Sequence, residues 1–248
     1  MEPQEGLTPW RSASAQVLVS NLDSLELEPD DLHHLQRVLR LREGDEVCAT
    51  NGQGGWQSCA FLGAQQLEPL AEQHQELPPK YLVTVGFAVV KGERPELIVQ
   101  KLTELGVDRI WPFTAQRSVV RWDDERARKH LERLRRVARE SCAQSRRLWM
   151  PAVGYPSDSS QVDSTTGLAR FDQVHRSGAV LANMGGRPLQ QEDRIVLIGP
   201  EGGWDNAEAE GATSVGLAEN VLRAETAAIT AGVLLTALRA GFTSENLR

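Results

Sequence analysis

The sequence lacks several patterns that would place the chain in a familiar structural class. No run among its 248 residues approaches the roughly 20 apolar residues that a membrane-spanning helix needs. The acidic, proline-containing start, Met1–Pro9, is unlike a signal peptide. We therefore expect a globular protein of one large or two small domains, located in the cytoplasm.

Cysteine is scarce, which argues against a disulfide framework and a zinc site. Cys48, Cys59 and Cys142 are odd in number and show no C-x-x-C spacing. The adjacent His33 and His34 are not accompanied by an H-E-x-x-H motif or an acidic cluster. We interpret the cysteines as buried small side chains and predict no metal site.

Two nucleotide-binding motifs are also absent, G-x-G-x-x-G and the P-loop. Instead an apolar strand, Ile195–Ile198, runs into a glycine loop, Gly199–Gly203, and Asp205 follows at the start of a predicted helix. A second loop segment, Val221–Ala227, comes about twenty residues later, and its apolar Val221-Leu222 is expected to be a strand end. Glycines at the carboxyl end of a strand let the backbone approach a ligand, so the two loops predict one pocket. The alternative is a tight turn before a helix cap at Asp205.

Positive charge is concentrated in one segment of an acidic chain. Residues 117–147 hold eleven arginines and lysines against five carboxylates, although the whole chain carries a net charge of −7. Apolar residues within this segment recur every three or four positions, which predicts one buried helix face made of Ala127, Leu131, Leu134, Ala138 and Cys142. Arginines off that face either bind a phosphate backbone or form a solvated helix surface.

A pair of prolines, Pro78–Pro79, predicts a boundary between two domains, because proline stops both helices and strands. Before it, the pattern predicts strands at 17–19, 45–50 and 56–62, a hairpin loop at 51–55 and a helix at 31–39. After it, strands at 81–90, 109–113, 179–182 and 194–198 alternate with helices at 94–105, 123–146 and 225–240, which predicts an α/β domain with a mainly parallel sheet. The segment 156–167 is expected to be a surface connection.

Several separated motifs together resemble the RsmE family of 16S ribosomal RNA methyltransferases, members of the SPOUT class. They follow the order of that family across nearly the whole chain: His34 with Arg37-Val38-Leu39-Arg40 and Gly44-Asp45, Lys91-Gly92-Glu93-Arg94, Gln100 to Val107, Arg117-Ser118-Val119-Val120, Gln144-Ser145 with Arg147 and Pro151, Gly199 to Gly203, and Val221 to Ala227.

This resemblance implies a fold, a cofactor and a reaction. It implies a PUA-like β-barrel at residues 1–77 for RNA binding and a SPOUT methyltransferase domain at 80–248 that contains a trefoil knot. The reaction would be methylation of the N3 atom of a uridine in small-subunit ribosomal RNA, free or assembled in the 30S subunit, by a homodimer. S-adenosylmethionine (SAM) would contact three loops, through Leu181, Ala182, Asn183, Ile198, Gly199, Pro200, Glu201, Gly202, Gly203, Leu217, Ala218, Val221, Leu222, Arg223 and Thr226.

The chain departs from the usual pattern of the family at several positions. Ala143 and Arg146 stand where a glutamate and a glycine are usual, and Ala218-Glu219 replaces a common Gly-Pro. A positive φ at Ala218 would be costly, and a carboxylate at Glu219 would alter cofactor affinity unless it points to solvent.

Methyl transfer from a sulfonium requires mainly alignment, with help in removing a weakly acidic imide proton. Arg223 and Arg147 are candidates for stabilising the imide anion, with phosphate binding or a helix-end ion pair as the alternative for each. Glu201 is a candidate proton acceptor, although a carboxylate that caps nearby amides is the simpler interpretation.

Ten residues are predicted to contact RNA: His34, Arg37, Arg40, Lys91, Arg117, Arg135, Arg136, Arg139, Gln144 and Arg147. Around His34, Arg37 and Arg40, core packing would explain only the apolar residues Val38 and Leu39. Two rival functions remain at this stage. A noncatalytic ribosome-assembly factor would keep the fold and the basic helix, whereas a nucleotide-binding metabolic enzyme would leave the basic segment unexplained.

Overall fold

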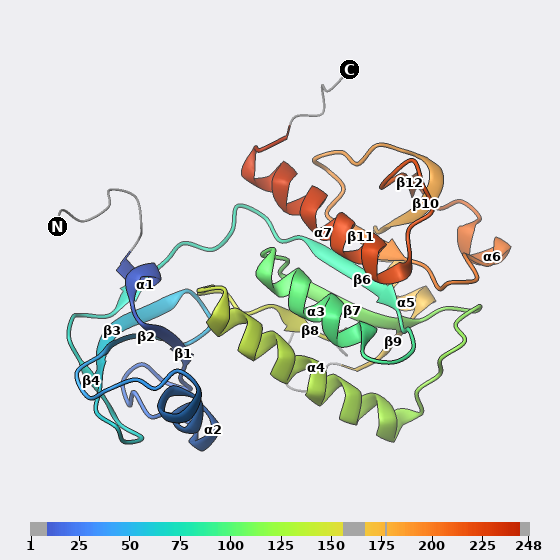
Figure 1. Cartoon of the computed structure of the whole chain (residues 1–248). Helices are drawn as coiled ribbons and strands as arrows, with labels where there is room; N and C mark the ends of the chain where they lie inside the picture. The colour runs from blue at the N-terminus through green and yellow to red at the C-terminus, as the bar shows by residue number, and fades with distance from the viewer. Residues whose placement is uncertain (1–8, 156–166, 177, 244–248) are drawn as a thin grey trace. The chain divides into compact units, whose positions relative to one another are not determined.

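The computed structural model describes residues 9–155, 167–176 and 178–243, and these residues form two compact units (Figure 1). The first unit contains the chain up to Pro79 together with Arg139–Met150, and the second contains Lys80–Ala138 and the chain from Pro151 onward. The first boundary between the two units falls directly after the paired prolines Pro78–Pro79. Residues 139–150, which follow that boundary in sequence, nevertheless pack with the first unit.

The first unit is built around a five-stranded sheet in the order β1-β2-β3-β4, with β5 paired to β3. Strands β2 and β3 form the expected hairpin, and β1 pairs with β2 in parallel. Its elements are α1 (Pro9–Ser12), β1 (Ala15–Leu18), α2 (Pro29–His33), the π-helical turn η1 (His34–Val38), β2 (Glu46–Thr50), β3 (Gly55–Phe61), β4 (Leu67–Pro69) and β5 (His74–Gln75).

The second unit is the expected α/β domain, because every strand pair in its seven-stranded sheet is parallel. The order is β12-β10-β11-β6-β7-β8, and β9 pairs with β7. Its elements are β6 (Thr84–Ala88), α3 (Arg94–Glu104), β7 (Arg109–Thr114), α4 (Asp124–Gln144, whose last turns from Arg139 belong to the first unit), β8 (Ala152–Val153), β9 (Ala169–Arg170), α5 (Phe171–His175), β10 (Val180–Arg187), β11 (Ile195–Ile198), α6 (Asn206–Ala209), β12 (Ser214–Val215) and α7 (Ala224–Ala240).

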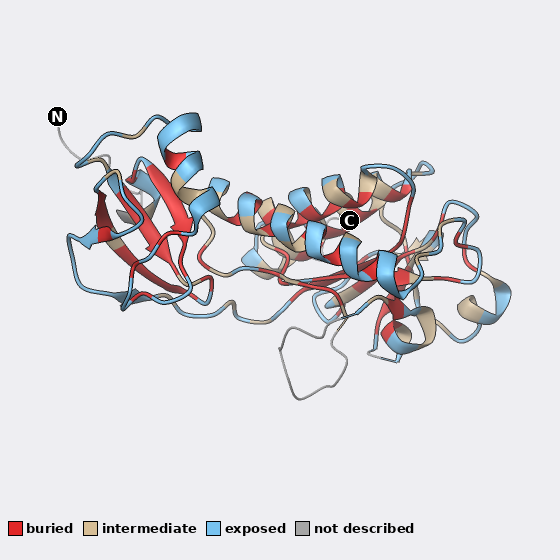
Figure 2. Cartoon of the chain, turned by 90° about the horizontal axis from the view of Figure 1, so that it is seen from below, coloured by how far each residue is buried: buried red, intermediate tan, exposed pale blue. Residues whose placement is uncertain are grey.

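Both faces of this sheet are covered, as the continuous apolar strands require. In β11, Val196 and Ile198 pack on one face with residues of α3, α4 and α7. Leu197 points to the other face and joins Trp111, Phe113 and Trp204. Figure 2 shows the strands buried and the outer helix surfaces exposed.

Three expectations needed correction. The helix expected at 31–39 is divided into α2 and the π-helical turn. The strand expected at 179–182 is β10, which continues to Arg187 with an irregularity in its pairing between Ala182 and Arg187. Val221–Leu222 is no strand end, since β12 ends at Val215 and Val221 is 78% exposed. The segment predicted at 156–167 lies outside the described residues except for Gly167, which pairs with Tyr155.

Candidate functional site

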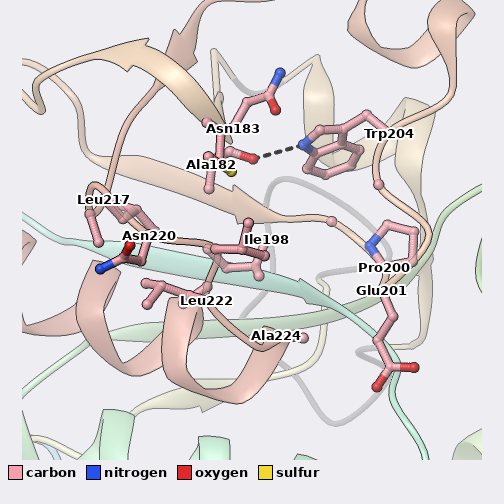
Figure 3. A pocket seen from close by; sticks show the side chains of 16 residues that line it. Ala182, Asn183, Ile198, Pro200, Glu201, Trp204, Leu217, Asn220, Leu222 and Ala224 are labelled. Carbon is pink, nitrogen blue, oxygen red and sulfur yellow. Dashed lines mark hydrogen bonds between the residues drawn. The ribbon is translucent and has the colours of Figure 1, made fainter.

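A pocket of about 210 Å³ lies at the carboxyl end of β11, beside residues 182–184 of β10 and the loop that leads into α7 (Figure 3). The two segments singled out in the sequence therefore share one pocket, as predicted. Its lining residues are Ala182, Asn183, Met184, Ile198, Gly199, Pro200, Glu201, Gly203, Trp204, Leu217, Ala218, Asn220, Val221, Leu222, Ala224 and Ala227.

The glycine loop is shaped by two local requirements. Gly203 has a φ of +71°, in the left-handed region that favours glycine. A Cβ atom on Gly199 would lie 2.9 Å from Cε2 of Trp204, so that position has no room for a side chain. Asp205 then caps α6, where its Oδ1 accepts from the Ala207 amide at 3.1 Å. The loop is thus both a pocket wall and a turn into a capped helix.

Four of the predicted cofactor-binding residues do not line the pocket: Leu181, Gly202, Arg223 and Thr226. Leu181 is fully buried in the sheet core. Arg223 is exposed at the N-cap of α7, and its side chain makes no capping hydrogen bond. Within the described residues, no hydrogen bond or ion pair involves its guanidinium.

The structure adds five lining residues that the sequence did not assign to the cofactor: Met184, Trp204, Asn220, Ala224 and Ala227. Ala224 and Ala227 begin α7, and Asn220 lies within the loop already considered. Trp204 carried a sequence signal, since it directly follows the glycine loop, but an apolar residue before a helix cap equally suits core packing.

Two arginines hold the outside of the glycine loop. Arg94, at the start of α3, forms an ion pair with Glu201, and its Nε lies 3.9 Å from Oε1 of Glu225. Arg117 lies 3.3 Å from the Asp205 carboxylate and donates to the Gly202 carbonyl at 3.4 Å. Arg94 follows β6, which is next to β11 in the sheet, and Arg117 follows β7, the strand beyond β6.

The arginine-rich helix α4 is amphipathic as predicted, and the five apolar residues of its predicted face are all buried. Its arginines are not equivalent. Arg135 donates to the Val153 carbonyl at 3.2 Å, and burial lowers its pKa. Arg139 binds Asp31 at 2.5 Å and the Leu18 carbonyl at 2.6 Å. Arg136 is exposed, with no intramolecular partner among the described residues.

Five other residues that are predicted to contact RNA are exposed, like Arg136. In the first unit His34, Arg37 and Arg40 are exposed around the π-helical turn, and so is Gln144. Lys91 is exposed in the second unit. Packing does not explain Val38 and Leu39, which are 61% and 44% exposed; only Leu35 of this turn is buried.

Arg147 belongs to the first unit, where its backbone carbonyl accepts from Gln16 Nε2 at 2.8 Å.

The structure shows how the chain accommodates its departures at Arg146 and Ala218-Glu219. Arg146 has a φ of +58°, which accounts for the usual glycine at that position. Its guanidinium compensates by donating to the carbonyls of Ala13 at 2.9 Å and Ser14 at 3.1 Å. Ala218 does not adopt a positive φ, and Glu219 is exposed and does not line the pocket.

No group of three or more His, Cys, Asp or Glu residues suited to a metal ion occurs in the described part of the chain. The same part contains no helix long and apolar enough to cross a membrane.

Comparison with known proteins agrees with the site. Residues 77–236 match the RNA methyltransferase domain family, and residues 27–65 match the RNA methyltransferase PUA domain family. The ribosomal RNA small subunit methyltransferase E of Synechocystis is 35% identical over 87% of this chain and 73% of that protein. The Bacillus subtilis protein of the same name is 29% identical over 84% of this chain and 88% of that protein.

Among solved structures, a methyltransferase from Legionella pneumophila, in complex with bound SAM, is 26% identical and has a TM-score of 0.75. The alignment covers 90% of this chain and 96% of that one. The pocket geometry, the two domain matches and these relatives agree with the family expected from the motifs: the chain belongs to the ribosomal RNA small subunit methyltransferase E family.

Proposed function

We propose that this protein transfers a methyl group from SAM to the N3 atom of a uridine in small-subunit ribosomal RNA. The observation that carries the proposal is the shared pocket formed by the irregular part of β10, the loop after β11 and the loop before α7. These are the three segments expected to hold SAM, and they lie within the matched RNA methyltransferase domain.

The residues of the pocket suit this cofactor. Ile198, Leu217 and Leu222 provide apolar walls for an adenine ring, and Asn183 and Asn220 contribute amides that can hydrogen-bond polar groups (Figure 3). The missing Cβ at Gly199 makes room for the Trp204 ring, which itself lines the pocket. When bound, SAM supplies an electrophilic methyl group on its sulfonium.

The protein itself must orient the uracil and stabilise the imide anion that forms when N3 loses its proton. We assign the second task to Arg223. A cation at a helix N-terminus is unfavourable for the helix, because the N-terminal end of the macrodipole is positive. Arg223 nevertheless occupies the N-cap of α7 without a partner among the described residues, so its charge is available to a substrate. Arg147 is the second candidate for this role.

Substrate recognition is proposed to involve both units. The PUA domain match covers His34, Arg37 and Arg40, and their exposure leaves them accessible to a phosphate backbone. Lys91, Arg117, Arg136, Gln144 and Arg147 complete the proposed RNA contacts. Arg117, Arg135 and Arg139 have structural partners, so we give them a smaller share.

The oligomeric state, knot and location follow from the family resemblance as proposals. The exposed apolar side chains of Val233 and Phe242, 43% and 86% exposed, support a subunit contact near α7. A homodimer would be recognised by sedimentation. We also propose that the second unit, residues 80–248, contains the trefoil knot and that the protein acts in the cytoplasm on the 30S subunit or its RNA.

The decisive experiment is methyl transfer from labelled SAM to small subunits that lack the native modification, followed by mapping of the product. We expect label at N3 of one uridine. Label at another atom would refute the proposed position, and RNA binding without any transfer would support a noncatalytic assembly factor.

A further inference from the structure

Strand β10 is irregular where it forms the pocket. Val215 of β12 pairs with both Ala182 and Arg187, so the four residues between them bulge out of the ladder. Gly186 permits this, because a Cβ there would lie 2.5 Å from the carbonyl carbon of Val215. Bulges of this kind often re-aim side chains beside active sites. Here the bulge carries Asn183 and Met184, which line the pocket and are exposed.

Trp204 fixes the start of this bulge. Its indole Nε1 donates to the Ala182 carbonyl at 2.9 Å, and Figure 3 shows this bond reaching from the loop after β11 to β10. Trp204 is 9% exposed, and its ring also closes over Gly199. One side chain therefore joins the bulge, the glycine loop and the pocket wall.

The ring of Trp204 is held from behind by aromatic neighbours. It stacks parallel to Phe113 of β7, with ring centroids 6.2 Å apart and an interplanar angle of 2°. Phe171 packs against it at 5.3 Å, tilted by 52°. A side chain fixed by packing on a rigid core can hold a loop within the small tolerance that a binding site needs.

We infer that Trp204 is a positioning residue for the cofactor: its indole N–H holds the β10 bulge against the glycine loop and so sets the width of the SAM pocket. This inference rests on the proposed function. It predicts that the hydrogen bond matters for affinity beyond its contribution to core packing.

The test compares two matched substitutions, Trp204→Phe and Trp111→Phe. Trp111 belongs to the same aromatic core, is 4% exposed and does not line the pocket. Its indole Nε1 is buried without a hydrogen-bond partner in the described structure. Both variants lose the same atoms from one core, but only Trp204→Phe loses a bond to a pocket loop.

Calorimetric titration with SAM should show roughly 3- to 10-fold weaker binding for Trp204→Phe, the cost of one neutral hydrogen bond, and unchanged affinity for Trp111→Phe. SAM should also change the tryptophan fluorescence of the wild type and of Trp111→Phe, but not of Trp204→Phe. Equal affinities in the two variants would overturn the inference while leaving the proposed function intact. Failure of the wild-type protein to bind SAM would overturn both.

Gly199→Ala alone tests the same contact if Trp204→Phe folds poorly, and unchanged SAM affinity in that single variant would contradict the inference. Gly199→Ala places a Cβ against the indole and should displace it, weakening SAM binding in the wild-type background. Combined with Trp204→Phe, it should weaken binding less than the two separate effects predict, because the residues act through one contact. Strict additivity would contradict the inference.

Discussion

Arg94 at the start of α3 is ion-paired with Glu201 in the glycine loop of the pocket. The pair joins two segments that lie more than a hundred residues apart in the sequence, and Glu225 of α7 lies beside the same arginine. Glu201 lines the pocket, but its carboxylate is engaged by a guanidinium and its side chain is 55% exposed. These contacts fit support of the loop better than proton transfer.

Glu201→Gln should therefore leave methyl transfer nearly unchanged. The substitution keeps the volume of the side chain and removes an exposed ion pair, which contributes about 0.2–1 kcal/mol. We expect the single-turnover rate to stay within about threefold of wild type, with Glu219→Gln as an exposed control. A fall of roughly 100-fold or more would instead identify Glu201 as the proton acceptor.

Arg223→Lys should slow the chemical step. Lysine keeps the charge but loses the planar fork, so stabilisation of an imide anion is reduced while the helix is unaffected. Single-turnover methylation at saturating SAM and RNA should fall by roughly 10- to 1000-fold, with both ligands still bound. A variant that binds RNA poorly but keeps its single-turnover rate would show that Arg223 only holds a ligand.

Gly199→Val should abolish SAM binding, because its side chain would collide with the Trp204 ring. Gly202→Val is the matched control in the same loop. Gly202 does not line the pocket, and a Cβ there meets its nearest neighbour, the Arg117 Cβ, at an ordinary 3.6 Å. Calorimetry should therefore show binding by Gly202→Val and none by Gly199→Val. Binding of SAM by Gly199→Val but not by Gly202→Val would indicate that the cofactor site lies on the outer side of the loop.

The exposed arginines of α4 should affect RNA binding differently from the paired ones. Arg136→Glu should weaken binding and reduce its salt dependence by about one released counterion, without loss of thermal stability. Arg139→Glu should lower the melting temperature, because it places a second carboxylate beside Asp31 and the Leu18 carbonyl. Arg176→Glu, on an exposed helix end, controls for net charge. An unaltered salt slope for Arg136→Glu would show a merely solvated side chain.

The buried cysteines should make the fold sensitive to alkali. Burial raises the pKa of Cys48 to about 12 and the pKa values of Cys59 and Cys142 to about 11, against an ordinary value of 9.0. The unfolded chain then loses these protons first, so stability is unaffected below pH 9 and falls as pH rises toward 11. Denaturant titrations across this range should show the fall, and Cys48→Ala should reduce it. An identical pH dependence in the variant would rule out a contribution from Cys48.

The sequence alone determined the features that depend on local chemistry. Strand and helix alternation, the buried face of α4, the glycine loop and the cap at Asp205 are all written in short-range patterns of apolar, glycine and capping residues. The motifs likewise sufficed to identify the family, and the glycine loop of the pocket followed from glycines placed at the end of a strand.

Only the tertiary structure decided which side chains meet. Arg135 and Arg139 look identical to Arg136 in sequence, yet two of the three are occupied by partners distant in the chain. The role of Trp204 was hidden for the same reason, because its hydrogen bond to Ala182 reaches from the loop after β11 to the neighbouring parallel strand β10. Such contacts depend on strand order and on a bulge, and neither is encoded in the periodicity of a single segment.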